Sequence, residues 1–367
     1  MNLFKGQRDQ LLSPLQSVCG IVEKRHTLPI LSNVLIEKDG DRLTLLATDI
    51  EIQITTTAPG IGTDKVAMTV GARKLQDILR SLPEDIEVSL ALDEKRLQLK
   101  AGKSRFNLQT LPAEDFPRMA VADGQPIHLS VTQRQMKHLL SLVQYSMAQQ
   151  DIRYYLNGLL MVAKGSELIV VATDGHRLAY ASETLPHSLE PIDVILPRKT
   201  VLELSRQLAD NDESLEVILT PTQARFRFGN IELVSKLIDG KFPDYDRVIP
   251  QHHGKIIRLD RSQLLHSLQR AAILTNDKFR GVRIVLAPGS LKIMSTNAEQ
   301  EEAQEEIEIT YDQEALDIGF NVTYLLDVLN NISSDFIELR LADANSSALF
   351  RLPDNEKFKY VVMPMRI

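Results

Sequence analysis

Hydrophobic and polar positions along this chain form a block pattern that occurs three times. Each copy contains, in the same order, an amphipathic helix, a pair of strands, a second helix and a closing strand. In the central copy of the first helix, apolar residues recur at the spacing of one helix face, at Met136, Leu139, Leu140 and Val143. The three copies of this helix read RDQLLSPLQSVCGIV, TQRQMKHLLSLVQYS and DRSQLLHSLQRAAIL. The pattern predicts three α+β modules built to one plan.

The spacing between copies is nearly constant. Successive copies of the second helix are 125 residues apart, measured at Leu79, Leu204 and Leu329. Successive closing strands are 126 apart, measured at Leu111, Leu237 and Met363. The bland alternative is that any three α+β domains look alike at this level of detail, but four blocks in register favour a true repeat.

Two local signals refine the helices. Thr132 and Gln135 have the spacing of a capping box, which predicts a helix start there. Pro14 lies inside the first copy and should be costly if it falls deep in the helix, because proline lacks a backbone N–H.

The strand pairs share a polar ending. Each copy has an apolar β-rich run, a turn containing glycine and a second alternating run. Each second run then reaches a Thr-Asp or Thr-Asn pair, at Thr48-Asp49, Thr173-Asp174 and Thr296-Asn297. Asp and Asn side chains commonly bond to backbone N–H groups two residues on, so this repeated pair predicts a turn.

Composition places the chain among ordinary globular proteins. Of its 367 residues, 43% are hydrophobic and 25% charged, with a net charge of −7. A lone Cys19 excludes a disulfide framework within one chain. No apolar run approaches the roughly 20 residues of a membrane span, and the N-terminus lacks the apolar stretch of a secretory signal. These features predict a cytoplasmic protein.

Several motifs identify a family. The segments TLPILSN, QDIRYYLNG, ATDGHRLA and KFPDY occur in this order, and the chain ends in YVVMPMRI. Over essentially its whole length the sequence resembles the beta subunit of bacterial DNA polymerase III. That resemblance implies an α+β fold with three clamp domains, at residues 1–122, 128–250 and 254–367. It also implies a head-to-tail homodimer that closes a ring around duplex DNA, with helices lining the hole and antiparallel sheets outside.

Two segments of opposite charge favour such a ring. Residues 95–105 carry five basic residues and no acidic one, whereas residues 299–308 carry six Glu and no basic one. Complementary surfaces at different places on one chain are what a head-to-tail contact requires. The alternative is that both are solvated strands with no common role. The expected interface residues are Lys74, Arg96, Lys103, Arg105, Phe106, Leu108, Ile273, Leu274, Glu299, Glu301, Glu302 and Glu305.

The family resemblance also implies a cleft that captures short linear peptides of partner proteins. Those partners would be the replicative polymerase, the clamp loader, translesion polymerases and repair proteins. The matching positions are Leu156, Thr173, Gly175, His176, Arg177, Leu178, Pro243, Arg247, Val248, Ser347, Val361, Met363, Pro364, Met365 and Arg366. The alternative for Leu156, Leu178 and Val361 is plain strand core.

Sequence-independent binding of double-stranded DNA would need basic residues that contact the backbone without reading bases. By resemblance the expected contacts are Arg25, Gln150, Arg153, Tyr154, Tyr155 and Lys199. The two tyrosines could stack on frayed bases, or could simply pack at a strand start. Lys74 could serve the DNA surface instead of the subunit interface.

Catalysis and metal binding are not expected. The chain has no GxxxxGK[ST], HExxH, CxxC or GxSxG motif. The TDGHR segment at 173–177 is the one candidate for acid–base chemistry, in a hydrolase built on Asp174 and His176, but the repeated turn explains it better. The pair His252-His253 lacks nearby ligands for a metal. The remaining rivals are a scaffold of the same fold that does not encircle DNA, and a specialised paralogue of the clamp.

Overall fold

The computed structural model describes residues 1–23, 28–251 and 254–366. Arg25 and the pair His252-His253, both considered above, lie outside these described residues. Backbone contacts divide the chain into two compact units: residues 1–136 with 202–237, and residues 137–201 with 238–367. The division passes through two helices of the second repeat, so that repeat contributes to both units.

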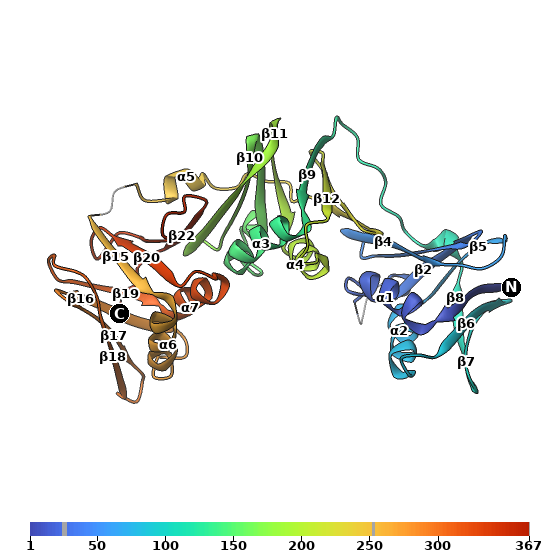
Figure 1. Cartoon of the computed structure of the whole chain (residues 1–367), viewed down its shortest axis with the longest axis horizontal. Coiled ribbons are helices and arrows are strands. Elements are labelled where there is room, and N and C mark those ends of the chain that lie inside the picture. Colours follow the sequence, from blue (N-terminus) through green and yellow to red (C-terminus); the bar gives the residue numbers. More distant parts are fainter. Residues whose placement is uncertain (24–27, 252–253, 367) are drawn as a thin grey trace. The chain divides into compact units, whose positions relative to one another are not determined.

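The first repeat follows the predicted order of elements (Figure 1). Its helices are α1 (Arg8–Cys19) and α2 (Ala72–Ser81), with 3-10 turns η1 (Pro29–Ser32) and η2 (Ala113–Asp115). Its strands are β1 (Asn2–Gln7), β2 (Asn33–Asp39), β3 (Arg42–Thr48), β4 (Ile52–Pro59), β5 (Lys65–Gly71), β6 (Glu87–Asp93), β7 (Arg96–Ala101) and β8 (Ser104–Leu111).

The second repeat has the same plan. Its helices are α3 (Gln133–Val143) and α4 (Arg198–Gln207), with 3-10 turns η3 (Gln144–Ser146) and η4 (Tyr154–Leu156). Its strands are β9 (Ile127–Thr132), β10 (Gly158–Thr173), β11 (Arg177–Pro197), β12 (Ser214–Leu219), β13 (Gln223–Phe228) and β14 (Ile231–Lys236).

The third repeat completes the described chain. Its helices are the short α5 (Tyr245–Val248), α6 (Arg261–Ala272) and α7 (Val322–Asn331). Its strands are β15 (Lys255–Asp260), β16 (Gly281–Ala287), β17 (Ser290–Thr296), β18 (Glu302–Glu308), β19 (Leu316–Asn321), β20 (Phe336–Leu341), β21 (Ala348–Arg351) and β22 (Phe358–Val362).

The predicted helix faces are buried. Leu79, Leu204 and Leu329, the landmarks of the second helix, have no exposed surface. The capping box is confirmed, since Thr132 and Gln135 exchange backbone-to-side-chain hydrogen bonds of 2.9 and 3.1 Å. Helix α1 continues through Pro14 to Cys19, so the proline is accommodated mid-helix at the cost of one backbone hydrogen bond.

Strand pairing repeats with the predicted modules. Each repeat places its Thr landmark opposite a residue five or six positions later, across the polar turn. These pairs are Thr48 with Gln53, Thr173 with Leu178, and Thr296 with Glu302. In the second copy, predicted as two runs around a turn, the strands merge into one element, β10, whose register against β11 shifts on each side of Gly165.

The spacing predicted for the closing strands needs a correction of one residue. In each repeat the closing strand pairs with the strand before it, and these pairs align the three copies. The pairs are Leu99 with Phe106, Phe226 with Leu233, and Phe350 with Tyr360. The closing-strand residue of each pair lies 127 residues after that of the previous repeat. The spacing of 126 matched apolar residues at or just after the ends of the strands, since Leu111 ends β8 whereas Leu237 and Met363 follow β14 and β22.

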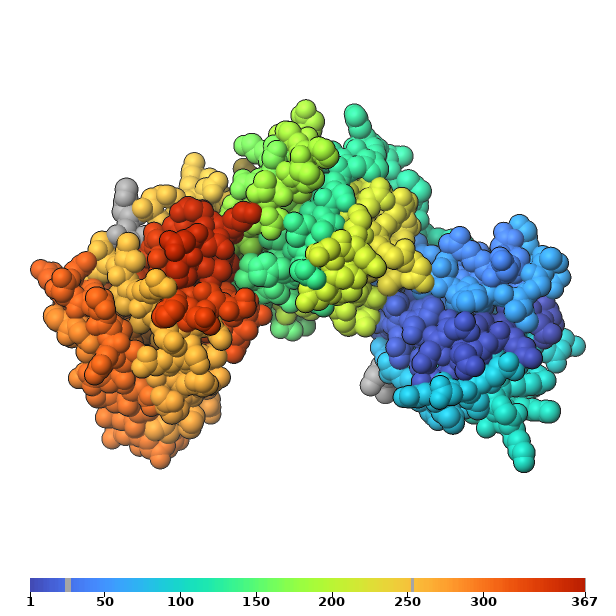
Figure 2. All heavy atoms as spheres, in the orientation of Figure 1, coloured from blue at the N-terminus to red at the C-terminus, as the bar shows by residue number. Residues whose placement is uncertain are grey.

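Successive repeats are joined by sheet pairing. At the first joint, β4 pairs with β14, with Ile52 opposite Ser235. At the second joint, β11 pairs with β22, with Arg177 opposite Val362. The first pairing extends a 12-stranded sheet, the second a six-stranded one, and a four-stranded sheet ends in β18. Figure 2 shows the red C-terminal atoms packed directly against the green atoms of the central repeat, as expected from the second joint.

Candidate functional site

A pocket of about 450 Å³ opens at the second joint. Its wall contains eleven of the residues predicted for the peptide cleft, contributed by η4, the β10–β11 turn with its flanking strand ends, the linker around α5, the β20–β21 loop and the end of β22. They are Leu156, Thr173, Gly175, His176, Arg177, Leu178, Pro243, Val248, Ser347, Val361 and Met363. Residues from two repeats, far apart in sequence, thus meet around one cavity, which is called the cleft below.

The floor of the cleft is apolar. Leu156, Leu178 and Val361 are at most 1% exposed and belong to one hydrophobic cluster, which Phe242 and Ile249 complete from the linker. Leu178 and Val361 are therefore strand core that also lines the cleft, whereas Leu156 is core at the end of η4 and not in a strand. Met363 is half exposed at the rim and supplies an adaptable apolar surface.

The remaining predicted cleft residues lie outside the cavity wall. Arg247 is 86% exposed and forms an ion pair with Asp244 at 2.9 Å. Pro364 and Met365 are half-buried and Arg366 is exposed, while the Met365 backbone N–H donates to the Gly319 carbonyl. They follow directly on Met363, so they flank the cleft without forming its wall.

A tight turn at residues 173–177 forms one rim of the cleft. Asp174 Oδ1 accepts hydrogen bonds from the backbone N–H groups of His176 (2.9 Å) and Arg177 (3.1 Å). Thr173 Oγ1 donates to the Arg177 carbonyl and accepts from the Gly175 N–H. The predicted turn role of the repeated Asp is confirmed, which removes Asp174 from acid–base chemistry. His176 is exposed on this rim.

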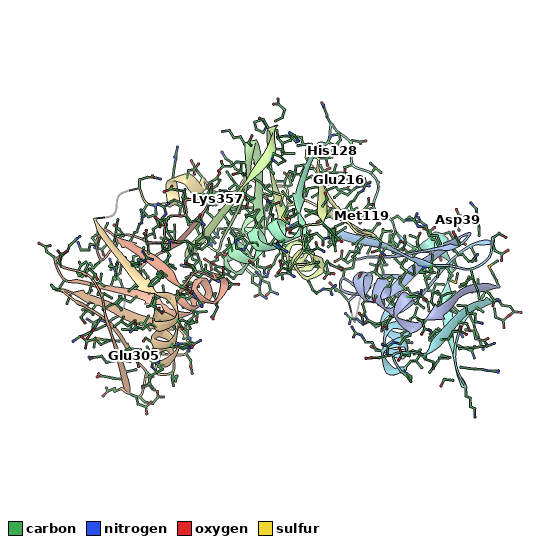
Figure 3. All side chains as sticks on the ribbon, viewed as in Figure 1. Asp39, Met119, His128, Glu216, Glu305 and Lys357 are labelled. Carbon is green, nitrogen blue, oxygen red and sulfur yellow. The ribbon has the colours of Figure 1, made fainter. Side chains whose placement is uncertain are left out.

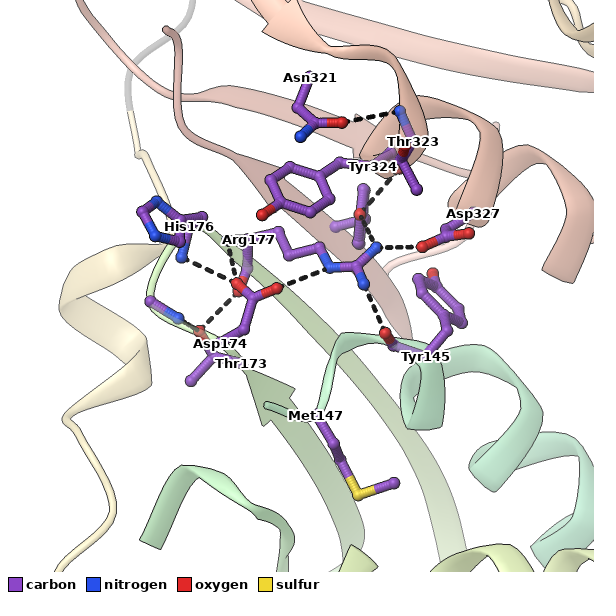
Figure 4. Close-up of polar contacts among 12 residues, drawn as sticks. Tyr145, Met147, Thr173, Asp174, His176, Arg177, Asn321, Thr323, Tyr324 and Asp327 are labelled. Carbon is purple, nitrogen blue, oxygen red and sulfur yellow. Dashed lines mark hydrogen bonds and ion pairs between the residues drawn. The ribbon is translucent and has the colours of Figure 1, made fainter. Parts of the chain in front are cut away.

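Arg177 is one of the predicted residues that line the cleft, and its guanidinium group also bonds to residues of its own chain. Its side chain is 9% exposed and runs from the rim into the joint (Figure 4). Nε donates to Asp174, Nη1 to Asp327 and more weakly to Tyr360, and Nη2 to the Tyr145 carbonyl.

Two aromatic rings complete the surroundings of this guanidinium group, whose carbon lies 4.5 Å from the Tyr324 ring centroid and 5.7 Å from that of Tyr145. Burial alone would lower the pKa of Arg177, but Tyr360, Asp327 and Asp174 outweigh it and hold that pKa above its usual value. Burial raises the pKa of Tyr360 and of Tyr145, so both phenols stay neutral.

The predicted DNA contacts fall into two groups. Gln150 and Tyr154 are exposed, Tyr154 at 57%, and Lys199 is half-buried at the start of α4. Arg153 and Tyr155 instead line the cleft, a role that the sequence did not indicate. Arg153 bonds to both carboxylate oxygens of Asp151 and to the Asp174 carbonyl. The hydrogen bonds from Arg153 lower the pKa of Asp151 to about 2.

The basic segment lies at a strand edge. Strand β8 pairs with β7 along its length and with β5 at Thr110 and Leu111. Residues 104–109 therefore have one strand neighbour within the described part of the chain. Phe106 and Leu108 are half-buried on one face of this edge. The exposed basic residues are Lys74, Arg96, Lys103 and Arg105.

The acidic segment lies at another edge, because β18 is the outermost strand of its sheet. Glu299, Glu301 and Glu302 are exposed, and Ile273 nearby is 76% exposed with Leu274 half-buried. Glu305, labelled in Figure 3, forms an ion pair with Arg270 of its own chain, and Arg270 lowers the pKa of Glu305. Glu305 therefore must leave or share this cation to meet a second chain.

Within residues 1–23, 28–251 and 254–366, no group of three or more His, Cys, Asp or Glu side chains is arranged to hold a metal ion. No helix in that part of the chain is long and apolar enough to cross a membrane.

Comparison with known proteins identifies the family. Three models match consecutive segments: DNA polymerase III beta subunit, N-terminal domain (residues 2–120), central domain (130–244) and C-terminal domain (246–366). The chain belongs to the DNA polymerase III beta subunit family.

Individual family members are similar over the whole length. The beta sliding clamp of Pseudomonas aeruginosa is 46% identical, over 99% of this chain and 100% of that protein. That of Escherichia coli K12 is 43% identical, also over 99% and 100%. A crystal structure of the Pseudomonas aeruginosa subunit has a TM-score of 0.95, with both chains covered completely. A Caulobacter crescentus family member has 0.93 at 39% identity, again with complete coverage.

Family membership confirms the three-module α+β fold and the expectation that the chain is not an enzyme, since the family's proteins are sliding clamps. The sequence did not predict the partners of Arg177. Asp327 stands out as an acid within the apolar helix segment VTYLLDVL, which was the available signal.

Proposed function

We propose that this chain is a ring-forming sliding clamp that encircles duplex DNA and tethers the replicative polymerase for processive synthesis. Family membership supports this proposal. The single structural observation that carries it is a pair of open strand edges with opposite charge, β8 and β18. The domain boundaries proposed are 1–122, 128–250 and 254–367, and the compartment proposed is the cytoplasm.

The repeated joint supplies a model for closing the ring. At both internal joints, the strand after the Thr-Asp turn pairs with the closing strand of the next repeat. In the third repeat the corresponding strand is β18, and the first repeat's closing strand is β8. We therefore propose that β18 pairs with β8 of a second copy, which makes the contact head-to-tail.

The repeat also gives the register of this third joint. Because Ile52 corresponds to Glu301 and Ser235 to Leu108, Glu301 should lie opposite Leu108 of the second copy. The same register places Ala303 opposite Phe106, so the half-buried faces of both edges coincide. Ile273 and Leu274 would extend this apolar centre, and the surrounding charges would set orientation more than affinity.

The cleft at the second joint is the proposed binding site for partner peptides. A Pseudomonas aeruginosa clamp 45% identical to this chain has been solved bound to griselimycin, with a TM-score of 0.96. The apolar floor and half-exposed Met363 support binding of several partners through short apolar motifs. Those partners would be the polymerase, clamp loader, translesion polymerases and repair proteins.

DNA binding would be weak and independent of sequence. Gln150, Tyr154 and Lys199 are the proposed contacts, together with Arg25, Arg153 and Tyr155. Arg153 would have to leave Asp151 or share it, which should reduce its contribution to DNA binding. A closed ring retains DNA topologically, and a polymerase held in the cleft rebinds the primer end at high effective concentration.

Retention on circular DNA tests this function. The chain would be loaded on a nicked plasmid with ATP and a bacterial clamp loader, then passed over a sizing column in high salt. A topological ring stays with the circle and is lost after the plasmid is linearised, because charge contacts alone dissociate in salt. Release from the circular plasmid in high salt would contradict encirclement and favour a scaffold of the same fold.

A further inference from the structure

The guanidinium group of Arg177 uses most of its hydrogen-bonding capacity within its own chain. Of the five N–H donors that an arginine has, four are used, for hydrogen bonds to Asp174, Asp327, the Tyr145 carbonyl and the Tyr360 phenol. The rings of Tyr324 and Tyr145 lie against it. Although Arg177 lines the cleft, its charged end lies between Asp174, Asp327 and Tyr145 (Figure 4).

These contacts connect the cleft rim to the third repeat. Asp174 binds Arg177 Nε with Oδ2 while its Oδ1 holds the N–H groups of the 173–177 turn. Asp327 fixes the same guanidinium from α7, and Tyr360, which also donates to the Tyr324 carbonyl, fixes it from β22. The Arg177 side chain therefore links the turn to α7, and it adds to the backbone pairing that already joins β11 to β22.

The chain shows that a joint does not require this network. At the first joint the position of Arg177 is occupied by Ile52, which is 1% exposed and makes the same backbone pairing. A buried ion pair contributes little net stability compared with apolar residues of similar volume. A buried charged network at the second joint, in the place of a buried isoleucine at the first, therefore calls for a role other than stability.

We propose that Arg177 is a positioning residue, which holds the 173–177 rim of the cleft against the third repeat in the shape that accepts a partner peptide. This inference rests on the proposed function of the cleft. It predicts that residues outside the cleft wall, Asp327 above all, control peptide affinity through Arg177 without touching the peptide.

The test uses the full chain with griselimycin as the probe, measured by calorimetry. Asp327→Asn keeps the shape of the side chain but removes the charge opposite Arg177, and should weaken binding about tenfold. Asp317→Asn is the matched control. Asp317 lies on β19, outside the cleft wall, and pairs with Arg283 on β16, so its replacement should leave affinity unchanged. Leu178→Gln changes the cleft floor itself, so its loss of griselimycin affinity shows the effect of removing a direct contact.

A double variant separates positioning from stability. Arg177→Met with Asp327→Leu replaces the buried charges with apolar groups and should melt within a few degrees of the wild type. It should still bind about tenfold more weakly, because the rim is no longer held. Wild-type affinity in this double variant, or in Asp327→Asn, would overturn the proposal.

Hydrogen exchange of the unliganded protein gives a readout that needs no probe. In Asp327→Asn the N–H groups of His176 and Arg177 should exchange about tenfold faster, with no change in Asp317→Asn. Unchanged exchange would refute the link between Asp327 and the rim. If the wild type does not bind griselimycin, the cleft assignment fails, and this exchange experiment alone decides whether Arg177 holds the turn.

Discussion

The first and second joints share one backbone arrangement but carry different side chains. At the first joint Asp49 Oδ1 accepts from the N–H groups of Glu51 and Ile52, as Asp174 does from His176 and Arg177. Lys236 N–H donates to the Glu51 carbonyl, and Met363 N–H donates to the His176 carbonyl in the same register. Ile50 and Gly175 have positive φ angles of 81° and 87°.

The side chains decide what each joint presents. At the first joint Gln53 accepts a hydrogen bond from the Met119 N–H, and Gln223 donates to the Ala120 carbonyl, so the linker is bonded across the sheet (Figure 3 labels Met119). At the second joint Leu178 replaces Gln53 and forms an apolar floor, while the linker supplies Pro243 as a wall. The same backbone framework thus carries a hydrogen-bonded linker at the first joint and a cleft at the second.

This difference teaches that the cleft depends on a few substitutions within a repeated framework. Backbone pairing and the Asx-type turn provide the joint, and they are indifferent to the side chains that point away from it. Exchanging residues between the two joints should therefore change stability and binding without changing the pairing.

The largest effect is expected from exchanging the central residue. Ile52→Arg buries a guanidinium at the first joint, where Asp49 corresponds to Asp174 but Leu202 and Leu233 occupy the positions of Asp327 and Tyr360. It should destabilise the first unit by about 3–5 kcal/mol. The reverse change, Arg177→Ile, leaves Asp327 without its cation, but the Asp327 side chain is 32% exposed and can be solvated. Arg177→Ile should therefore lower the free energy of unfolding by less, about 2 kcal/mol.

Guanidinium denaturation, with hydrogen exchange resolved over residues 42–59 and 168–184, measures both variants. An equal loss of unfolding free energy in the two variants would mean that the first joint can supply partners for the arginine. That result would contradict the difference drawn between the joints.

A smaller effect of opposite sign is expected at the positive-φ position. Ile50→Gly relieves a β-branched residue held at φ 81° and should stabilise by about 0.5–1 kcal/mol. Gly175→Ala should destabilise by about 1–2 kcal/mol, because the residue has positive φ and the added Cβ would lie 2.8 Å from Arg153 Nη1. The same denaturation measurement checks both signs, and a loss of stability in Ile50→Gly would show that Ile50 makes packing contacts worth more than its strain.

Much of this account could be predicted from the sequence because it depends on periodic burial. The three modules and the polar turns follow from repeated apolar and polar spacing, whereas the eleven cleft residues follow from the family resemblance alone. The closing strands were placed one residue out, because hairpin register and not the nearest apolar residue sets their alignment.

The Arg177 network could not be predicted, because its members are far apart in the chain. Its hydrogen bonds reach Tyr145 over 32 residues, Asp327 over 150 and Tyr360 over 183. No local sequence pattern indicates contacts between side chains that are so far apart in the chain. For the same reason Arg153 and Tyr155 were expected to serve DNA alone, although both lie on the cleft wall.

Cross-linking two copies in the predicted register tests the central claim, that a third joint of the same kind closes the ring. The register places Glu305 opposite Ser104 of a second copy, so Ser104→Cys with Glu305→Cys should form disulfides under oxidation and migrate as a covalent dimer. Cys19 will not interfere, because it is buried and burial raises its pKa to about 12.

Ser104→Cys with Glu306→Cys is the control, since neighbouring strand residues point to opposite faces of the sheet. A covalent dimer for the Glu305 pair and little for the Glu306 pair is the result predicted. A monomer for both, or a dimer that favours the Glu306 pair, would contradict the third joint and leave the chain without its ring.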